Sequence, residues 1–282
     1  MSSLLKKESI NVFSHGGGDD TTLLLNLILE KDKRLKDYWD IDLVVFADPQ
    51  MEMQYTYDYL KNHTIPALER AHIPFRHLYH PDGGLYERMF AKNMVMMGWA
   101  NPLCSSSSKR DLIRSCYREL FGIENQSGNK YLSHSFIEIN EIMGMHAGEP
   151  KRVENFNKGN QPKYLKRSAP LYEAGLEKKH YDHEFKILKK PRPGSSHCDG
   201  CPNLGINGYR EILTNRPQQF KRLVALEENA KLGDWSKGNP TSIPDFELKE
   251  LYSWKKWSKK KFDEFENWFE LQCNAEGGFC NR

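Results

Sequence analysis

The chain contains, near its N-terminus, the stretch Val12-Phe13-Ser14-His15-Gly16-Gly17-Gly18-Asp19-Asp20-Thr21-Thr22-Leu23-Leu24. Residues 10–13 predict a short strand, and residues 21–30 predict a helix because their leucine and isoleucine side chains recur on one helical face. Consecutive glycines let the backbone approach an anion closely, and the N-terminus of the following helix adds a favourable dipole. The stretch therefore indicates a phosphate-binding turn between a strand and a helix.

The polar groups of this turn are candidate contacts for phosphate oxygens and for a metal ion. The expected phosphate donors are backbone N–H groups and hydroxyls of Ser14, Gly16, Gly17, Gly18, Thr21 and Thr22. Asp20 would repel a phosphate unless Mg²⁺ or its water shell lies between them, so we expect Asp20 to bind that ion. His15 either contacts a nucleotide or packs under the turn. The glycine spacing matches neither a Walker A loop nor a Rossmann fingerprint, and an ordinary strand-to-helix turn is the alternative.

The segments that follow the turn predict an α/β protein with a doubly wound parallel sheet. The apolar run at 41–47 predicts a buried parallel strand, residues 55–71 predict a helix, and residues 75–79 predict the next strand. Further along, we expect an amphipathic stretch at 133–140 that leads into a strand at 142–145, and a loop at 150–168. The remaining predicted elements are helices at 110–121, 208–231 and 249–272. We expect a nucleotide-binding domain over 1–190 and a mostly helical, cysteine-containing appendage over 191–282.

Composition excludes several classes of protein. The chain has 282 residues and a formal net charge of +3, which is close to balance and does not suggest a general nucleic-acid coat protein. Its apolar runs are too short to span a bilayer, and its first residues lack the apolar core of a secretory signal, so we expect a cytoplasmic protein. Lysines and tryptophans at 254–262 either grip a polynucleotide or form the solvated face of a helix.

Most of the six cysteines have spacings that suit a metal centre. Cys198 and Cys201 are separated by two residues, Cys273 and Cys280 flank a glycine pair, and Cys104 is a fifth candidate ligand. Cys116 lies on the apolar face of a predicted helix and is expected in the core. All-cysteine ligation suits a [4Fe–4S] cluster or Zn²⁺, and a redox pair at 198–201 is the alternative.

Beyond the glycine turn, several motifs along the chain resemble one family. Phe46-Ala47-Asp48-Pro49-Gln50-Met51-Glu52 resembles its second strand end, Cys104 with Lys109-Arg110 its cysteine–lysine segment, and Gly144 to Arg152 its glycine–acidic–arginine motif. Cys198-Asp-Gly-Cys201-Pro202 and the tail Cys273 to Cys280 resemble its cysteine blocks. The chain is similar to the PP-loop ATP pyrophosphatase superfamily, and more closely to the phosphoadenosine phosphosulfate reductase-like proteins common in phages and mobile elements. Two departures are Gly148, where an aspartate is usual, and Asp19-Asp20, which replace a commonly basic or amide pair.

The resemblance implies roles for residues outside the turn. Asp48 and Gly144 would contact the nucleotide, and Asp20, Lys109 and Arg152 would act in catalysis, the two cations by neutralising phosphate charge. Glu149 would orient Arg152 or bind Mg²⁺. The cysteines would hold a [4Fe–4S] cluster, with Zn²⁺ as the alternative, because cluster-bearing relatives handle sulfur.

The activity implied is that of an ATP- and Mg²⁺-dependent enzyme that adenylates a substrate, releases pyrophosphate and supports sulfur transfer. The expected ligand is an adenine nucleotide, and candidate partners are a nucleic-acid substrate, a sulfur-donor protein and a second copy of the chain. Reduction of phosphoadenylyl sulfate (PAPS) to sulfite is the first alternative. The second is a nucleotide-binding module of a DNA-modification or defence assembly.

Overall fold

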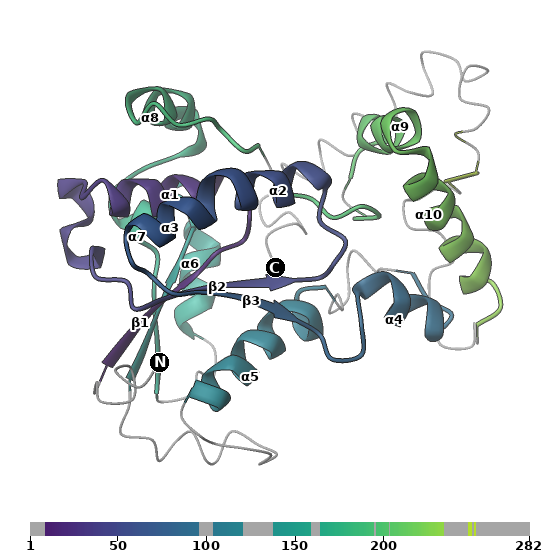
Figure 1. Ribbon diagram of the computed structural model, residues 1–282, viewed down its shortest axis with the longest axis horizontal. Helices are drawn as coiled ribbons and strands as arrows, with labels where there is room; N and C mark the ends of the chain where they lie inside the picture. Colours follow the sequence, from purple (N-terminus) through teal and green to yellow (C-terminus); the bar gives the residue numbers. More distant parts are fainter. Residues whose placement is uncertain are drawn as a thin grey trace. The chain divides into compact units, whose positions relative to one another are not determined.

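The computed structural model describes residues 9–95, 104–120, 138–158, 164–194, 196–202, 204–233, 248, 249 and 251 (Figure 1). The chain forms two compact units, each made of segments that are far apart in the sequence. The first unit comprises Met1–Ala47, Gln54–Leu78 and Asp111–Ser196. The second comprises Asp48–Met53, Tyr79–Arg110 and His197–Arg282.

A five-stranded parallel sheet organises the first unit, in the order β3-β2-β1-β4-β5. The strands are β1 Ser9–Ser14, β2 Leu43–Asp48, β3 Phe75–Tyr79, β4 Glu138–Met143 and β5 Leu165–Ser168. The chain runs outward from β1 to β3 on one side and then returns to the other side of β1 to form β4. The point where the strand order reverses therefore lies between β1 and β4. The predicted α/β class with a parallel sheet is confirmed.

Helices cover both faces of this sheet because its strands carry apolar side chains on both sides. Phe13, Val44 and Ile142 pack in one core with side chains of α1 (Asp19–Leu29), α3 (Ile65–Arg70), α7 (Pro170–Glu173) and α8 (Tyr181–Ile187). Ile10, Val12 and Val45 pack in a second core with side chains of α5 (Asp111–Leu120). Figure 1 shows α1 and α3 on one side of the sheet and α5 on the other. Neighbouring strand residues thus face opposite cores, as the pleat requires.

The second unit has its own core. Its helices are α4 Leu85–Ala91, α9 Ile206–Asn215 and α10 Pro217–Ala230, with a π-helix at Ser106–Arg110. The buried core includes Met51, Leu85, Tyr209, Phe220 and Leu223, each at most 3% exposed.

Several predicted elements are correct in type, and others need correction. The helix predicted at 55–71 consists of α2 (Gln54–Tyr59), a π-helix (Leu60–Thr64) and α3. The loop predicted at 150–168 was wrong, because it contains α6 (Pro150–Lys158) and the edge strand β5. The helix predicted at 208–231 is divided at Arg216, since Pro217 disfavours a helical conformation in the residue before it. Most of the helix predicted at 249–272 lies outside the described residues.

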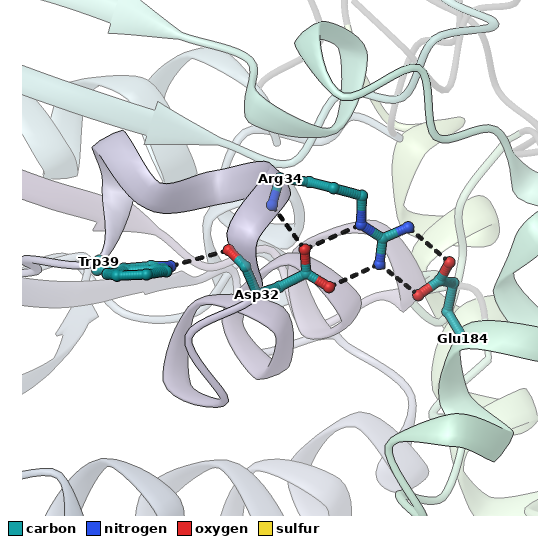
Figure 2. Close-up of polar contacts among 4 residues, drawn as sticks. All are labelled: Asp32, Arg34, Trp39 and Glu184. Carbon is teal, nitrogen blue, oxygen red and sulfur yellow. Dashed lines mark hydrogen bonds and ion pairs between the residues drawn. The ribbon is translucent and has the colours of Figure 1, made fainter.

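Arg34 links the segment after α1 to α8, because its guanidinium contacts the carboxylates of both Asp32 and Glu184 (Figure 2). Its Nη1 and Nη2 donate to Glu184 at 2.8 and 2.7 Å, and its Nε donates to Asp32 Oδ1 at 2.9 Å. The indole Nε1 of Trp39 donates to the Asp32 carbonyl oxygen at 3.0 Å. Hydrogen bonds from Arg34 hold the pKa values of Glu184 and Asp32 below their usual ranges.

We expect Arg34→Gln to lower the free energy of unfolding by about 1–2 kcal/mol at pH 7, a value that allows for partial solvent screening. Because the folded pKa values of both carboxyls are depressed, this contribution is complete above their ordinary pKa values and is lost as pH falls through the folded values. Urea unfolding between pH 7 and pH 3 measures it. Lys179→Gln is the control, since its ion pair with Glu177 is largely exposed. Equal losses at pH 7 and pH 3 would contradict the assignment.

Candidate functional site

The glycine turn is tied together by its own side chains. The Gly16 N–H donates to Thr21 Oγ1 at 3.1 Å, and the Gly17 N–H donates to His15 Nδ1 at 3.0 Å. The Thr21 hydroxyl donates in turn to the Gly18 carbonyl oxygen at 3.3 Å. Two of the amides predicted to bind phosphate are therefore engaged within the turn, and a bound anion would use the first turn of α1 or replace these partners.

Glycine is required at Gly17 and Gly18 by close approach of other segments of the first unit. Gly17 has φ +79°, and a Cβ there would lie 2.6 Å from the Thr56 methyl group. A Cβ on Gly18 would lie 2.8 Å from Ser196 Oγ. The segment that contains Gly194 and Ser196 covers the turn, and the Gly194 carbonyl oxygen accepts a hydrogen bond from the Asp19 N–H at 3.1 Å. The missing side chains thus admit Thr56 and Ser196 to the surface of the turn.

Buried polar atoms around the turn lack partners. His15 Nε2, Asp19 Oδ1, Thr22 Oγ1 and Thr56 Oγ1 are buried and make no hydrogen bond in the described structure. Burial lowers the pKa of His15 to about 4, so its imidazole is neutral at physiological pH. Unsatisfied buried groups are uncommon in native proteins and mark places where water, an ion or a ligand binds.

Both acidic residues of the turn have partners far away in the sequence. Arg192 Nε donates to Asp19 Oδ2 at 2.8 Å, and the Tyr181 hydroxyl donates to Asp20 Oδ1 at 2.6 Å. Burial, followed by the nearby Asp20 carboxylate, raises the pKa of Tyr181, so the phenol keeps its proton and remains a donor. Sequence reasoning missed Tyr181 and Arg192, because no local pattern connects them with the turn.

The segment after β4 lies against the start of α1. A Cβ on Gly144 would lie 2.8 Å from the Thr21 nitrogen and 2.9 Å from its Cα, so only glycine permits this contact. Arg152 Nη1 contacts Glu149 Oε1 at 2.9 Å, and the His146 N–H donates to Glu149 Oε2 at 3.3 Å. Of the residues placed by resemblance, the structure therefore brings Gly144 beside the turn and pairs Arg152 with Glu149.

Lys109 and Asp48 belong to the second unit. Lys109 Nζ contacts Glu52 Oε1 at 2.9 Å, and Glu52 pairs with Cys198 in an antiparallel bridge. Burial lowers the pKa of Lys109, but the Glu52 carboxylate and nearby thiols outweigh it and raise the pKa above its ordinary value. Asp48, the last residue of β2, is buried and accepts a hydrogen bond from the Gln50 N–H at 2.6 Å.

Three of the candidate metal ligands belong to the second unit: Cys198 is buried in its core, and Cys104 and Cys201 are half-buried and pack against that core. Burial raises the pKa values of Cys104 and Cys198, and Lys109 counteracts part of this effect. No group of three or more His, Cys, Asp or Glu side chains that could hold a metal ion occurs within the described residues. Cys273 and Cys280 lie outside those residues. Cys116 is in the core beneath the sheet, as predicted.

Comparison with protein-family models and with the curated proteins finds no match to this chain. Within the described part of the structure, no helix has the length and apolar character needed to cross a membrane.

The contact between Gly144 and Thr21 predicts a difference between two glycine substitutions. We expect Gly144→Ala to lower the free energy of unfolding by about 2 kcal/mol, because the added methyl group meets backbone atoms that cannot move independently. Gly16→Ala should change it by less than about 0.5 kcal/mol, since its methyl group would make ordinary contacts at 3.7 Å or more. Urea unfolding of both variants measures the difference, and equal stabilities would contradict the close approach.

Proposed function

We propose that the chain is a PP-loop-type enzyme that binds MgATP at Gly16–Thr21 and adenylates a substrate. The observation that carries the proposal is the position of the glycine turn. The turn follows the carboxyl end of β1, beside the point where the strand order reverses, and Gly144 after β4 lies against it. In open parallel sheets, ligands bind outside the carboxyl ends of the strands at such a reversal.

The polar groups of the turn fit a phosphate ligand in part. The first N–H groups of α1 point out of the helix end without helical partners, and the helix dipole favours an anion there. Neutral His15 and the unpartnered hydroxyl of Thr56 add buried hydrogen-bonding capacity. Against this, Asp19 and Asp20 contribute negative charge; Arg192 offsets that of Asp19, whereas the neutral Tyr181 hydroxyl donates a hydrogen bond to Asp20. A cation bound with the nucleotide would complete the compensation.

Mg²⁺ is the cation that the proposal requires, and Asp20 is its candidate ligand. Bound Mg²⁺ would neutralise charge on pyrophosphate as it leaves. Asp20 Oδ1 accepts a hydrogen bond from the Tyr181 hydroxyl at 2.6 Å, which fixes the orientation of the carboxylate. In the reaction, a substrate oxygen attacks the α-phosphorus of ATP, the bond to the β-phosphate oxygen breaks, and the electron pair leaves with pyrophosphate. A sulfur nucleophile would then displace AMP from the adenylated substrate.

Two alternative functions rest on the same turn. In PAPS reduction, the turn binds a sulfonucleotide, and a cysteine thiolate attacks its sulfur atom and displaces the adenosine bisphosphate. A thiol reductant added to the assay then attacks the cysteine S-sulfonate, so that a disulfide forms and sulfite leaves. In a non-enzymatic module, ATP binds and is not cleaved. Incubation with each nucleotide distinguishes them, because the first proposal requires pyrophosphate from ATP, reduction releases sulfite from PAPS, and the module releases neither.

We expect MgATP to raise the melting temperature of the protein, because it binds the native state. Gly17→Ala should abolish this rise, since the methyl group is forced against Thr56 and the backbone has φ +79°. Gly175→Ala is the matched control, because Gly175 also has positive φ (+69°) but no atom lies within 4 Å of its would-be Cβ. Thermal shift assays with ATP, with and without Mg²⁺, compare the three proteins. An undiminished response of Gly17→Ala would remove the turn from the proposal.

We also propose that Cys104, Cys198 and Cys201, together with Cys273 or Cys280, hold a [4Fe–4S] cluster, or Zn²⁺ in its place. Support comes from the packing of the first three in one core and from Lys109, whose charge favours thiolates there. A bound cluster would supply electron transfer or a sulfur site.

Cys198→Ser and Cys201→Ser should each lose most of the bound metal, because thiolates are the ligands such centres require. Cys116→Ala should keep it, since Cys116 packs in the other unit. Metal content and visible absorption of anaerobically purified protein measure this, and iron with labile sulfide would distinguish a cluster from zinc. Full metal content in both serine variants would end the proposal.

A further inference from the structure

A small pocket of about 80 Å³ opens in the first unit beside α1. Its lining comes from α1, from the segment that contains the π-helix Leu60–Thr64, and from Lys190 and Pro191, which precede the segment that covers the glycine turn. The lining residues are Thr22, Leu25, Asn26, Tyr59, Asn62, His63, Thr64, Ala67, Arg70, Lys190 and Pro191. All of them belong to one compact unit.

Thr22 gives the pocket a buried donor that has no partner. Its side chain is 2% exposed, and its hydroxyl makes no hydrogen bond in the described structure. Successive helical residues point about 100° apart, so Thr21 bonds the Gly16 N–H while Thr22 lines the pocket. Asn26 lies one turn further along α1 on the same side, which places an amide beside that hydroxyl.

The opposite wall is the π-helix Leu60–Thr64, an uncommon structure that is frequent at functional sites. Asn62, His63 and Thr64 of this segment line the pocket. The Tyr59 hydroxyl donates to the Pro191 carbonyl oxygen at 2.8 Å. This hydrogen bond joins the wall that contains the π-helix to the side of the pocket formed by Lys190 and Pro191. The three sides are therefore held in place without a ligand.

The charge of the lining favours an anion. Arg70 and Lys190 are cations and the lining contains no Asp or Glu, although burial and the nearby Asp19 carboxylate raise the pKa of Tyr59, which also lines the pocket. Lys190 Nζ lies 3.5 Å from Glu30 Oε1, and Glu30 is more than half exposed. The Tyr59 hydroxyl is already engaged by Pro191 and the Asn26 side chain, whereas the Thr22 hydroxyl has no partner and each asparagine amide has two hydrogens to donate.

The volume limits the size of that anion. Water occupies about 30 Å³ in the liquid, and pockets for drug-sized ligands are commonly about 300 Å³ or more. A space of about 80 Å³ therefore suits a small inorganic oxyanion.

We propose that this pocket binds an inorganic tetrahedral oxyanion, phosphate or sulfate, through the Thr22 hydroxyl, the Asn26 and Asn62 amides and the Arg70 guanidinium. The site is distinct from the glycine turn, where Thr21 and not Thr22 is engaged. It does not depend on the proposed activity, although anion binding at Thr22 would act on the first turn of the same helix.

Calorimetric titration of the full chain with sodium phosphate and with sodium sulfate, at ionic strength matched with sodium chloride, tests the proposal. We expect saturable binding of at least one oxyanion and none of chloride, and the two titrations identify which oxyanion binds. Thr22→Val and Arg70→Gln should each weaken binding by about tenfold or more, since hydrogen bonds to charged groups commonly contribute that much. Arg70 is exposed, so its replacement leaves the fold intact.

Two control variants each remove a group of the same kind, a hydroxyl or a cation, at another position. Thr56→Val deletes another buried hydroxyl without a partner, and Lys36→Gln deletes another exposed cation of the first unit; neither residue lines the pocket. Binding should survive in both controls and in Gly17→Ala. Absence of saturable binding in the wild type, or unchanged affinity in both pocket variants, would overturn the proposal. Loss of binding in Gly17→Ala with retention in the pocket variants would assign the anion to the glycine turn instead.

Discussion

The absence of a side chain at Gly144 is the constraint on which the carboxyl edge of the sheet depends. A Cβ there would lie within 3 Å of the Thr21 nitrogen and Cα, so the segment after β4 could not lie against the start of α1. This contact joins the two loops that flank the reversal of strand order. Because Ser14 pairs with Met143, the residue after β4 meets the start of the glycine turn directly, and a side chain at position 144 would have to displace the first turn of α1.

Charge compensation at the turn comes from the chain around residues 181–192. Two consecutive aspartates at a helix N-terminus are favoured by the dipole but repel each other and any incoming anion. Arg192 and Tyr181 hold one carboxylate each, and Arg192 also contacts Asp182 at 2.6 Å. The Gly194 carbonyl oxygen and Ser196 then cover the turn. A ligand at the turn would therefore act on this covering segment as well as on the turn itself.

The second unit contains an ion pair beside its cysteines. Glu52 is buried and forms an ion pair with Lys109, whose side chain is 35% exposed, beside Cys198, in a core made largely of leucine, methionine and isoleucine side chains. Buried ion pairs are weak contributors to stability, because desolvation opposes their attraction. The two charges act on the neighbouring thiols in opposite directions. Burial and the Glu52 carboxylate raise the pKa of Cys198, whereas the Lys109 ammonium lowers it, and Cys104 is affected in the same way.

Local patterns in the sequence determined the strand–glycine–helix stretch, the buried strand β2, the half-buried strand β3 and the core position of Cys116, because each depends on the pattern of neighbouring residues. The edge strand β5 and helix α6 were missed, since their short, polar segments are stabilised by pairing with β4 and by packing rather than by their own pattern. The partners of the turn could not be predicted either. Tyr181 is 161 residues from Asp20, and Arg192 is 173 residues from Asp19. Only the tertiary structure decided which charges the acidic residues face and which donors line the pocket beside Thr22, because such contacts depend on how distant segments pack and not on the order of residues along the chain.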